Sequence, residues 1–331
     1  MPPFSDRERN ELAERLAALQ LRSCLISGGQ ELLFEHYRDD TIPNEIAKTN
    51  SCTKSVLSAL ICIAMDRGQL PGAETPAAVF FPRLADDSDP RKAAITLEQL
   101  LNMSAGFEWN EFGGINSFPR MIRTPDWVRF VLELPLAETP GAGMVYNSGI
   151  SQLLATILAK AVGNVAAYAE ETLFRPLGIG AYKWETDPDG VHTGGFGLSL
   201  KPGDMLKFGQ LFAQEGVWEG QQIISQELVR RSVSPALPAD PSFPGQYGWH
   251  WWVDALPADS GGQATDSGPP SAGDTNRADA TAYYYARGFG GQFIYVVPAL
   301  DTVVVLTSES KKRKRPDAFR EYIGPLLLAR G

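Results

Sequence analysis

Four consecutive residues, Ser51-Cys52-Thr53-Lys54, place a hydroxyl and an amine one helical turn apart. Side chains three residues apart lie on the same face of a helix, so Lys54 can approach the Oγ of Ser51. A serine hydroxyl becomes a good nucleophile when a base takes its proton, and a lysine in a closed apolar or cation-rich pocket can be that base. The pattern therefore indicates acyl transfer, with a lysine that points to solvent as the alternative.

The spacing alone is weak, because a chain of 331 residues contains about one Ser-x-x-Lys by accident. A second copy begins at Ser308, but it follows the apolar run TVVVLT and enters a basic stretch in which nothing would position the two side chains. The first copy opens an apolar pattern over 51–68 that predicts a helix ending at Gly68. Helix starts favour negative charge, so we assign the chemistry to the first copy.

A tyrosine in a second segment can take part in the same proton transfers. The segment PGAGMVYNS, 140–148, precedes a helical pattern, and Tyr146 is the only one of ten tyrosines with Ser or Asn two residues later. Its phenol could accept the serine proton as phenolate or relay a proton to the leaving group. If Tyr146 stood alone, a buried tyrosine with a satisfied hydroxyl would be the better interpretation.

A glycine-rich segment, RGFGGQFIYVV, begins at Arg287 beside an apolar strand. Glycines such as Gly290 and Gly291 let a substrate approach the backbone closely. The strand edge there can bind an acyl group and offer an N–H to the oxyanion. A glycine-rich hairpin turn explains the same residues equally well.

The elements that must position these residues follow from periodicity and capping. Ser5 with Glu8 predicts a capping box that opens a helix, and CLISGGQELLFEHYR predicts two strands around Gly28-Gly29. Helical patterns dominate the middle of the chain, with Thr96 and Lys201 as examples of helix starts. Strand patterns then return in QYGWHWWVD, ATAYYYARG, GQFIYVV and DTVVVLTS. Strands at both ends predict one antiparallel sheet assembled from the two termini.

Composition narrows the function classes. A net charge of −9 argues against a nucleic-acid partner. The three cysteines lack zinc-ligand spacing, and HExxH, GxSxG and GxGxxG do not occur, so we expect no metal and no cofactor. The N-terminus lacks a signal peptide and no stretch is long enough to span a bilayer, so we expect a cytoplasmic protein without a membrane partner. We expect the polar segment 255–280 to be a poorly ordered surface loop, and the basic run 311–315 to be a solvated turn.

In this order the segments resemble the serine β-lactamase-related superfamily, which includes class C β-lactamases, penicillin-binding DD-peptidases, esterases and 6-aminohexanoate-dimer hydrolases. The resemblance runs from about residue 20 to 325, through SCTKSVLSALICIAMDRG, ITLEQLLNMSAGFEW, PGAGMVYNSG, GGFGLSLKPGDMLKFGQLF, YGWHWWV and GFGGQFIYVVPALDTVVVLTS. It implies an α+β fold of the β-lactamase/DD-peptidase type, in which helices flank the antiparallel sheet beside a mostly helical subdomain. We expect a single domain over 1–331, with an α/β part at about 1–70 and 240–331 and a mostly helical part at about 71–239.

The resemblance also implies roles for individual residues. Ser51 would be the acylated nucleophile, Lys54 its neighbouring base and Tyr146 the proton-relay phenol. The oxyanion would be bound by the N–H of Ser51 and by one near Gly291, within one residue, which includes Gly290. Whether Lys54 or Tyr146 takes the serine proton is left open.

Two departures from the family pattern affect the substrate. The usual Tyr-x-Asn becomes Tyr146-Asn147-Ser148, where Ser148 keeps a shorter polar contact. The usual Lys/His-Thr-Gly becomes Gly288-Phe289-Gly290, with Arg287 as the nearest substitute cation. His192-Thr193-Gly194 spells that motif literally, but its position predicts at best a loop beside the cleft. Trp109, Trp251 and Trp252 are candidates for an apolar acyl pocket, and Trp109 is the one we favour.

The missing cation and hydroxyl disfavour penicillins and D-Ala-D-Ala peptides, whose carboxylates need such partners. The sequence therefore predicts a serine hydrolase, of the esterase or amidase kind, that acts on small-molecule esters or amides. The alternatives are a β-lactamase or DD-carboxypeptidase, or a non-hydrolytic penicillin-binding-like sensor. The sequence predicts no oligomeric state.

Overall fold

An eight-stranded sheet lies at the centre of the computed structural model, which describes residues 3–19, 21–239, 245–257, 280–309 and 317–330. Its order is β2-β1-β13-β12-β11-β10-β9-β8, and neighbouring strands pair antiparallel. The strands are β1 (Ser23–Gly28), β2 (Glu31–Tyr37), β8 (Leu237–Pro238), β9 (Gln246–Tyr247), β10 (Trp252–Leu256), β11 (Thr281–Gly288), β12 (Gln292–Val297) and β13 (Thr302–Thr307). Because β1 pairs with β13, the predicted sheet from both termini is confirmed.

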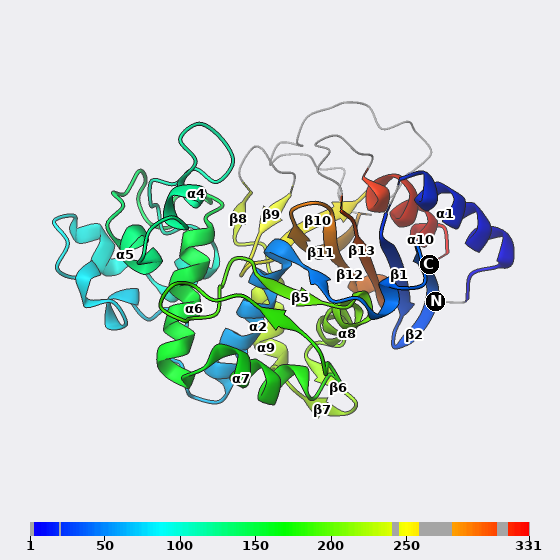
Figure 1. Ribbon diagram of the computed structural model, residues 1–331, viewed down its shortest axis with the longest axis horizontal. Helices are drawn as coiled ribbons and strands as arrows, with labels where there is room; N and C mark the ends of the chain where they lie inside the picture. Colours follow the sequence, from blue (N-terminus) through cyan, green and yellow to red (C-terminus); the bar gives the residue numbers. More distant parts are fainter. Residues whose placement is uncertain (1–2, 20, 240–244, 258–279, 310–316, 331) are drawn as a thin grey trace.

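Helices cover the two faces of this sheet (Figure 1). On one face α8 (Pro202–Ala213) lies so close to β12 and β13 that a Cβ on Gly209 would sit 2.5 Å from Val303 Cγ1. On the other face α1 (Asp6–Ala18) and the C-terminal helical turns, η8 (Phe319–Ile323) and α10 (Gly324–Leu328), enclose an aromatic cluster in which Phe319 stacks on Tyr295. The predicted α+β class, a sheet between helices, is therefore confirmed.

The remaining helices lie on the α8 side and to the left of the sheet in Figure 1. They are α2 (Thr53–Asp66), α3 (Leu97–Leu101), α4 (Ser117–Met121), α5 (Trp127–Leu132), α6 (Ser148–Val162), α7 (Val165–Ala169) and α9 (Gln226–Val233). Two small sheets, β3-β5-β4 (Ala47–Lys48, Leu198–Leu200, Lys183–Trp184) and β6-β7 (Val217–Trp218, Gln221–Gln222), connect them. α2 is almost entirely buried, α6 is buried over most of its length, and the two helices contact each other, which fixes the positions of Lys54 and Ser148.

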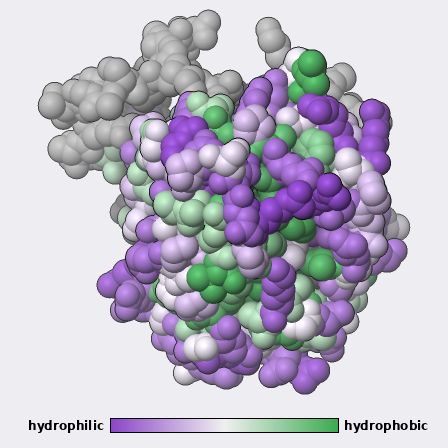
Figure 2. Space-filling model, turned by 90° about the vertical axis from the view of Figure 1, so that its left-hand side faces the viewer, coloured by the Kyte–Doolittle hydropathy of each residue, from purple (hydrophilic) through white to green (hydrophobic). Residues whose placement is uncertain are grey.

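The outer face of this helical part mixes hydrophilic and hydrophobic residues (Figure 2). Among the described residues no single helix has both the length and the apolar composition of a membrane span. Within the described part of the chain, the bent pair formed by Ser148–Val162 and Val165–Phe174 passes that test, on length and composition alone. The division of the chain into one domain with two parts stays a prediction.

The sequence predicted two helix starts correctly from their capping residues. Ser5 and Glu8 form the predicted capping box, and Thr96 forms a second one at the start of α3. The β1–β2 hairpin turns one residue later than predicted, at Gly29-Gln30, because Gly29 takes the positive φ of 57° that a tight turn needs. Most of the polar segment 255–280 and all of the basic run 311–315 lie outside the described residues.

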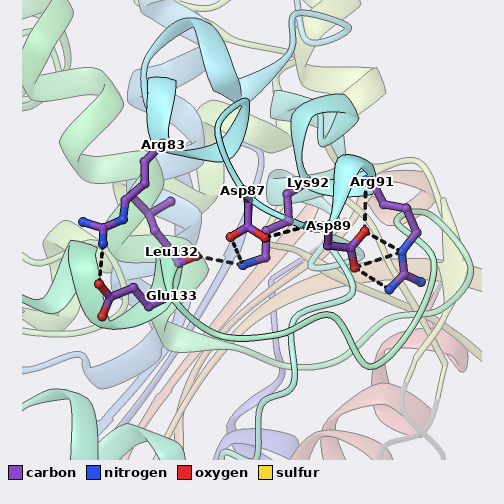
Figure 3. A network of polar contacts seen from close by, with 7 residues as sticks. All are labelled: Arg83, Asp87, Asp89, Arg91, Lys92, Leu132 and Glu133. Carbon is purple, nitrogen blue, oxygen red and sulfur yellow. Dashed lines mark hydrogen bonds and ion pairs between the residues drawn. The ribbon is translucent and has the colours of Figure 1, made fainter.

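A partly buried ion pair lies between the 3₁₀ turn Pro90–Ala94 and the end of α5 (Figure 3). Lys92, in the 3₁₀ turn Pro90–Ala94, is only 2% exposed and its Nζ donates to Asp87 Oδ2 at 2.7 Å. The same amine donates to the carbonyl of Leu132 at 3.1 Å, at the end of α5. Arg91 and Arg83 bind Asp89 and Glu133 nearby, at exposed positions. The 3₁₀ turn and α5 are thus held through a single amine.

We expect Lys92→Met to lower the free energy of unfolding by about 1–3 kcal/mol, because it leaves Asp87 and the Leu132 carbonyl without their donor. Urea denaturation of both proteins measures the difference. Lys48→Met is the matched control, since Lys48 pairs with Glu185 at 2.8 Å but is 67% exposed, and its effect should stay within about 0.5 kcal/mol. Equal losses in the two variants would contradict this assignment.

Candidate active site

Ser51 lies in a 3₁₀ turn (Asn50–Cys52) directly before α2, as the predicted helix start requires. Asn50 has a positive φ of 51°, and its side-chain amide donates to the carbonyl of Phe289 at 2.7 Å. Thr53 closes the turn through Oγ1, which donates to the carbonyl of Asn50 at 2.7 Å. The sharp turn brings Ser51 Oγ to 3.3 Å from Lys54 Nζ. The structure therefore brings these two side chains together.

Lys54 is buried, with 1% of its surface exposed, and does not point to solvent. Its Nζ donates to the carbonyl of Gly195 at 2.8 Å and to Ser148 Oγ at 3.0 Å. Among the described residues no carboxylate lies within ion-pair distance of it. Burial lowers the pKa of Lys54 to about 8, against a smaller opposing effect of the Glu111 charge. Roughly a tenth of this amine is therefore neutral at pH 7.

Tyr146 lies beside the same two groups. Ser51 is near enough to act on the pKa of Tyr146, and Lys54 Nζ is 4.7 Å from the centre of the Tyr146 ring. Phe112 stacks on the ring at 5.8 Å and Trp252 at 5.7 Å, so the phenol is held in an aromatic layer. Burial, reinforced by the Glu111 charge, raises the pKa of Tyr146 well above its ordinary value. The phenol is thus neutral in the resting protein.

Of the two residues after Tyr146, Asn147 caps the following helix and Ser148 contacts the site. Asn147 is the N-cap of α6, and its side chain accepts from the N–H of Ile150 at 3.1 Å. Ser148 is the first residue of α6 and presents its hydroxyl to Lys54. The order Asn-Ser therefore places the capping group and the polar contact on consecutive residues.

Glu111 also belongs to this cluster, although the sequence analysis did not predict it as a site residue. Its Oε1 accepts from Ser148 Oγ at 2.5 Å, and its Oε2 accepts from the N–H of Ser148 at 3.0 Å. Oε2 also accepts from Trp109 Nε1 at 2.6 Å. Glu111 lies in the loop after the recognised segment ITLEQLLNMSAGFEW, where the only signal is an acidic residue two positions beyond a tryptophan.

The glycine-rich segment is a hairpin turn between β11 and β12. Gly290 and Gly291 have positive φ values of 83° and 92°, and the N–H of Gly291 donates to the carbonyl of Gly288 at 3.3 Å. Gly288 lies against the nucleophile: a Cβ there would sit 2.2 Å from the Thr49 carbonyl oxygen and 3.2 Å from Ser51 N. Gly288 therefore packs against the backbone just before α2, whereas the predicted approach of a substrate to these glycines stays a prediction. The oxyanion role of Gly290 or Gly291 stays a prediction.

The other candidates around the site fall in different places. Phe289, at the tip of the hairpin, is 71% exposed. The charge of Arg287, next to it in the chain, acts to lower the pKa of Tyr146 and also that of Tyr285. Trp251 is fully buried between α8 and β11 and belongs to the core, whereas Trp252 stacks on Tyr146.

Trp109 is buried and binds Glu111 through its indole N–H. Its predicted contribution to an acyl pocket stays a prediction.

The segment His192-Thr193-Gly194 runs directly behind Lys54. A Cβ on Gly194 would lie 2.0 Å from the carbonyl oxygen of Ser151 in α6, and the next residue, Gly195, supplies the carbonyl that binds Lys54. Sequence reasoning placed this loop beside the cleft at best and missed Gly195. Among the described residues no three His, Cys, Asp or Glu side chains gather in a way that would hold a metal ion.

A buried amine beside a serine, at the start of a helix that packs against an antiparallel sheet, is the arrangement of a serine-hydrolase fold. The profile of the family described as Beta-lactamase matches residues 23–326. The chain belongs to the β-lactamase family, and the predicted superfamily is confirmed.

Solved structures share the fold at low sequence identity. An octameric penicillin-binding protein homologue from Pyrococcus abyssi is 18% identical, with a TM-score of 0.71 over 98% of this chain and 77% of its own. D-alanine carboxypeptidase AmpC from Burkholderia cenocepacia is 17% identical, with a TM-score of 0.68 over 99% and 100%. The hydrolase EstCE1, described as having promiscuous acyltransferase activity, is 13% identical, with a TM-score of 0.70 over 97% and 96%.

The buried amine should give stability a characteristic pH dependence. The unfolded chain binds the Lys54 proton with the ordinary pKa of 10.5, and the folded protein with a pKa of about 8. Between these values the unfolded chain holds the extra proton, so stability rises with pH. Relative to Lys54→Met, the free energy of unfolding of the wild type should rise by about 2–3 kcal/mol from pH 8 to pH 10.5. Denaturant titrations over this range test it, and a constant difference would contradict it.

Proposed function

We propose that this protein is a serine hydrolase that acts through an acyl-enzyme on Ser51, with small esters or amides as substrates. The observation that carries the proposal is the buried Lys54, whose Nζ lies 3.3 Å from Ser51 Oγ and whose pKa is lowered to about 8. Within the described part of the chain no carboxylate is paired with it, so the free amine is available as a base.

In the proposed reaction the free amine of Lys54 takes the proton of Ser51 Oγ as that oxygen attacks the carbonyl carbon of the substrate. The oxyanion is bound by the N–H of Ser51 and by a backbone N–H of the β11–β12 hairpin, where Gly288 lies nearest in the structure. When the tetrahedral intermediate collapses, the bond to the leaving group breaks and Lys54 returns the proton to it. Water then attacks the acyl-enzyme by the reverse proton path and releases the acid.

Tyr146 fits the role of relay better than that of resting base. Its pKa is raised by burial and by the Glu111 charge, so the phenol holds its proton near neutral pH. A neutral phenol beside Ser51 can pass a proton toward the leaving group and recover one from Lys54. Of the two alternatives left open by the sequence, the environment supports Lys54 as the base.

Apolar groups at the edges of the site support an uncharged substrate. Phe112 covers one side of Tyr146 and is 55% exposed, while Phe289 is exposed on the hairpin whose carbonyl binds Asn50 beside the nucleophile. Neither offers a partner to a carboxylate, and this favours esters or amides with apolar acyl groups. One observation favours β-lactamase or DD-carboxypeptidase activity as the second candidate: the positive charge of Arg287 is near enough to lower the pKa of Tyr146. A cytoplasmic location stays a prediction.

Removal of the nucleophile should abolish turnover of p-nitrophenyl butyrate without unfolding the protein, because Ser51 is only half-buried at the start of a helix. Ser51→Ala is expected to show the wild-type melting temperature and no burst of p-nitrophenol. Lys54→Met should keep the Ser51 nucleophile but hydrolyse the ester about 10²–10⁴-fold more slowly. A wild type that releases one equivalent and then stops would replace the hydrolase with the sensor alternative.

The substrate ranking is tested by comparing kcat/KM for p-nitrophenyl acetate, p-nitrophenyl butyrate and nitrocefin. We expect the esters to be at least tenfold better, since the hairpin offers Gly288-Phe289-Gly290 where a carboxylate would need a cation or hydroxyl. Arg287→Gln serves as the comparison: it should leave ester hydrolysis within a few-fold and reduce any nitrocefin hydrolysis. Faster nitrocefin than ester hydrolysis would place the protein with the β-lactamases in activity.

A further inference from the structure

The hydrogen bonds of Glu111 fix the direction in which one hydroxyl points. The carboxylate receives three donors, the N–H of Ser148, the indole N–H of Trp109 and the hydroxyl of Ser148. The first two hold the carboxylate in place, because a backbone amide and a buried indole have only one direction to donate in. The Ser148 proton, at a separation of 2.5 Å, is therefore committed to Glu111 Oε1.

This commitment determines what Ser148 offers to Lys54. A hydroxyl has one proton and two acceptor lone pairs. With its proton held by Glu111, Ser148 Oγ faces Lys54 Nζ at 3.0 Å only as an acceptor. The other close partner of the amine, the carbonyl oxygen of Gly195 at 2.8 Å, is an acceptor by its nature.

A neutral amine has two N–H donors and one lone pair. In Lys54 the two acceptors, Ser148 Oγ and the Gly195 carbonyl, take the two N–H groups. The third close contact is Ser51 Oγ at 3.3 Å, so the lone pair is left facing the hydroxyl that must lose its proton. If Ser148 were free to rotate, its own proton could occupy that lone pair and the base would be blocked.

We propose that Glu111 is a positioning residue for the reaction: it holds the Ser148 hydroxyl as an acceptor, so that the lone pair of neutral Lys54 points at Ser51. This inference rests on the proposed function for its biological meaning, but its chemistry concerns only the reactivity of Ser51. Glu111 contacts Lys54 only through Ser148 in this arrangement, and a loss of its charge and a loss of its hydrogen bond have opposite consequences.

The charge of Glu111 acts against the base, whereas its hydrogen bond acts for it. Its negative charge raises the pKa of Lys54 and keeps more of the amine protonated. The other titratable groups around the amine are neutral near pH 7: burial raises the pKa of Cys52 and of Tyr146, and lowers that of His250 to about 3. The positive charge of Arg287 acts on Tyr146 from β11. The experiment must therefore separate two effects of Glu111, the effect of its negative charge on the pKa of Lys54 and the effect of its hydrogen bond on the orientation of the Ser148 hydroxyl.

The test measures the rate at which Ser51 is phosphonylated by a p-nitrophenyl alkylphosphonate, from pH 5 to pH 10, by release of p-nitrophenol. We expect Glu111→Gln to lower the high-pH plateau about 10- to 100-fold, since an amide can donate to Ser148 and free its proton to block Lys54. The midpoint of the acid limb should move to lower pH in the same variant. Glu108→Gln, which removes an exposed carboxylate from the same loop, is the matched control and should change neither.

Ser148→Ala tests the same link from the other side and guards against a folding defect in one variant. If Glu111 acts through Ser148, then Glu111→Gln in the Ser148→Ala background should change the plateau less than twofold. Melting temperatures report folding in all variants. A lower midpoint with an undiminished plateau would overturn the proposal and leave Glu111 as a charge only, as would additive losses in the double variant.

The reagent keeps the outcome separate from that of the proposed function. Phosphonylation is a single stoichiometric event, so a wild type that reacts at Ser51 but turns over no ester would contradict the hydrolase while the Glu111 comparison still stands. A wild type whose Ser51 is no more reactive than that of Lys54→Met would overturn the positioning role itself.

Discussion

The constraint on which the site depends is the burial of one amine, Lys54, that has no counter-ion among the described residues. Taking an ammonium out of water costs several kcal/mol, and here its direct partners are a carbonyl, hydroxyls and the face of an aromatic ring. Those partners suit the neutral amine as well as the charged one, which is why Lys54 gives up its proton easily. The packing of α2 against α6 and β11 offsets this cost. A carboxylate in direct contact would stabilise the fold and disable the base.

In this protein the nearby carboxylate does not contact the amine directly, because the hydroxyl of Ser148 lies between them. Glu111 reaches the amine only through Ser148, and it is itself held by an indole and by the first N–H of α6. An anion at the start of a helix is favourable in its own right, because the terminal N–H groups there lack partners. Glu111 therefore stabilises α6 and directs the hydroxyl with the same two oxygens.

The sequence predicted the parts of the site that local geometry controls. Ser51 and Lys54 share a helix face by spacing, and Tyr146 with Ser148 precedes a helix whose cap, Asn147, is encoded beside them. Glu111 and Gly195 were missed because nothing in their neighbourhoods distinguishes them: an acidic loop residue and a glycine carbonyl acquire their meaning only when distant segments meet. The approach of a substrate to the hairpin glycines stays a prediction, and the residue that packs against the turn of Ser51 is Gly288, which only the strand register reveals.

The pairing of β1 with β13 has a consequence for how the protein comes into being on the ribosome. Every side chain proposed to handle protons has been synthesised by residue 148, but the strand that pairs with the N-terminal hairpin is made only at 302–307, and the turn against which Ser51 packs only at 288–291. During most of translation the growing polypeptide thus contains its reactive side chains without the strand and the turn that later pack around them. Synthesis of residues 288–307, close to the C-terminal end, therefore completes the surroundings of Ser51.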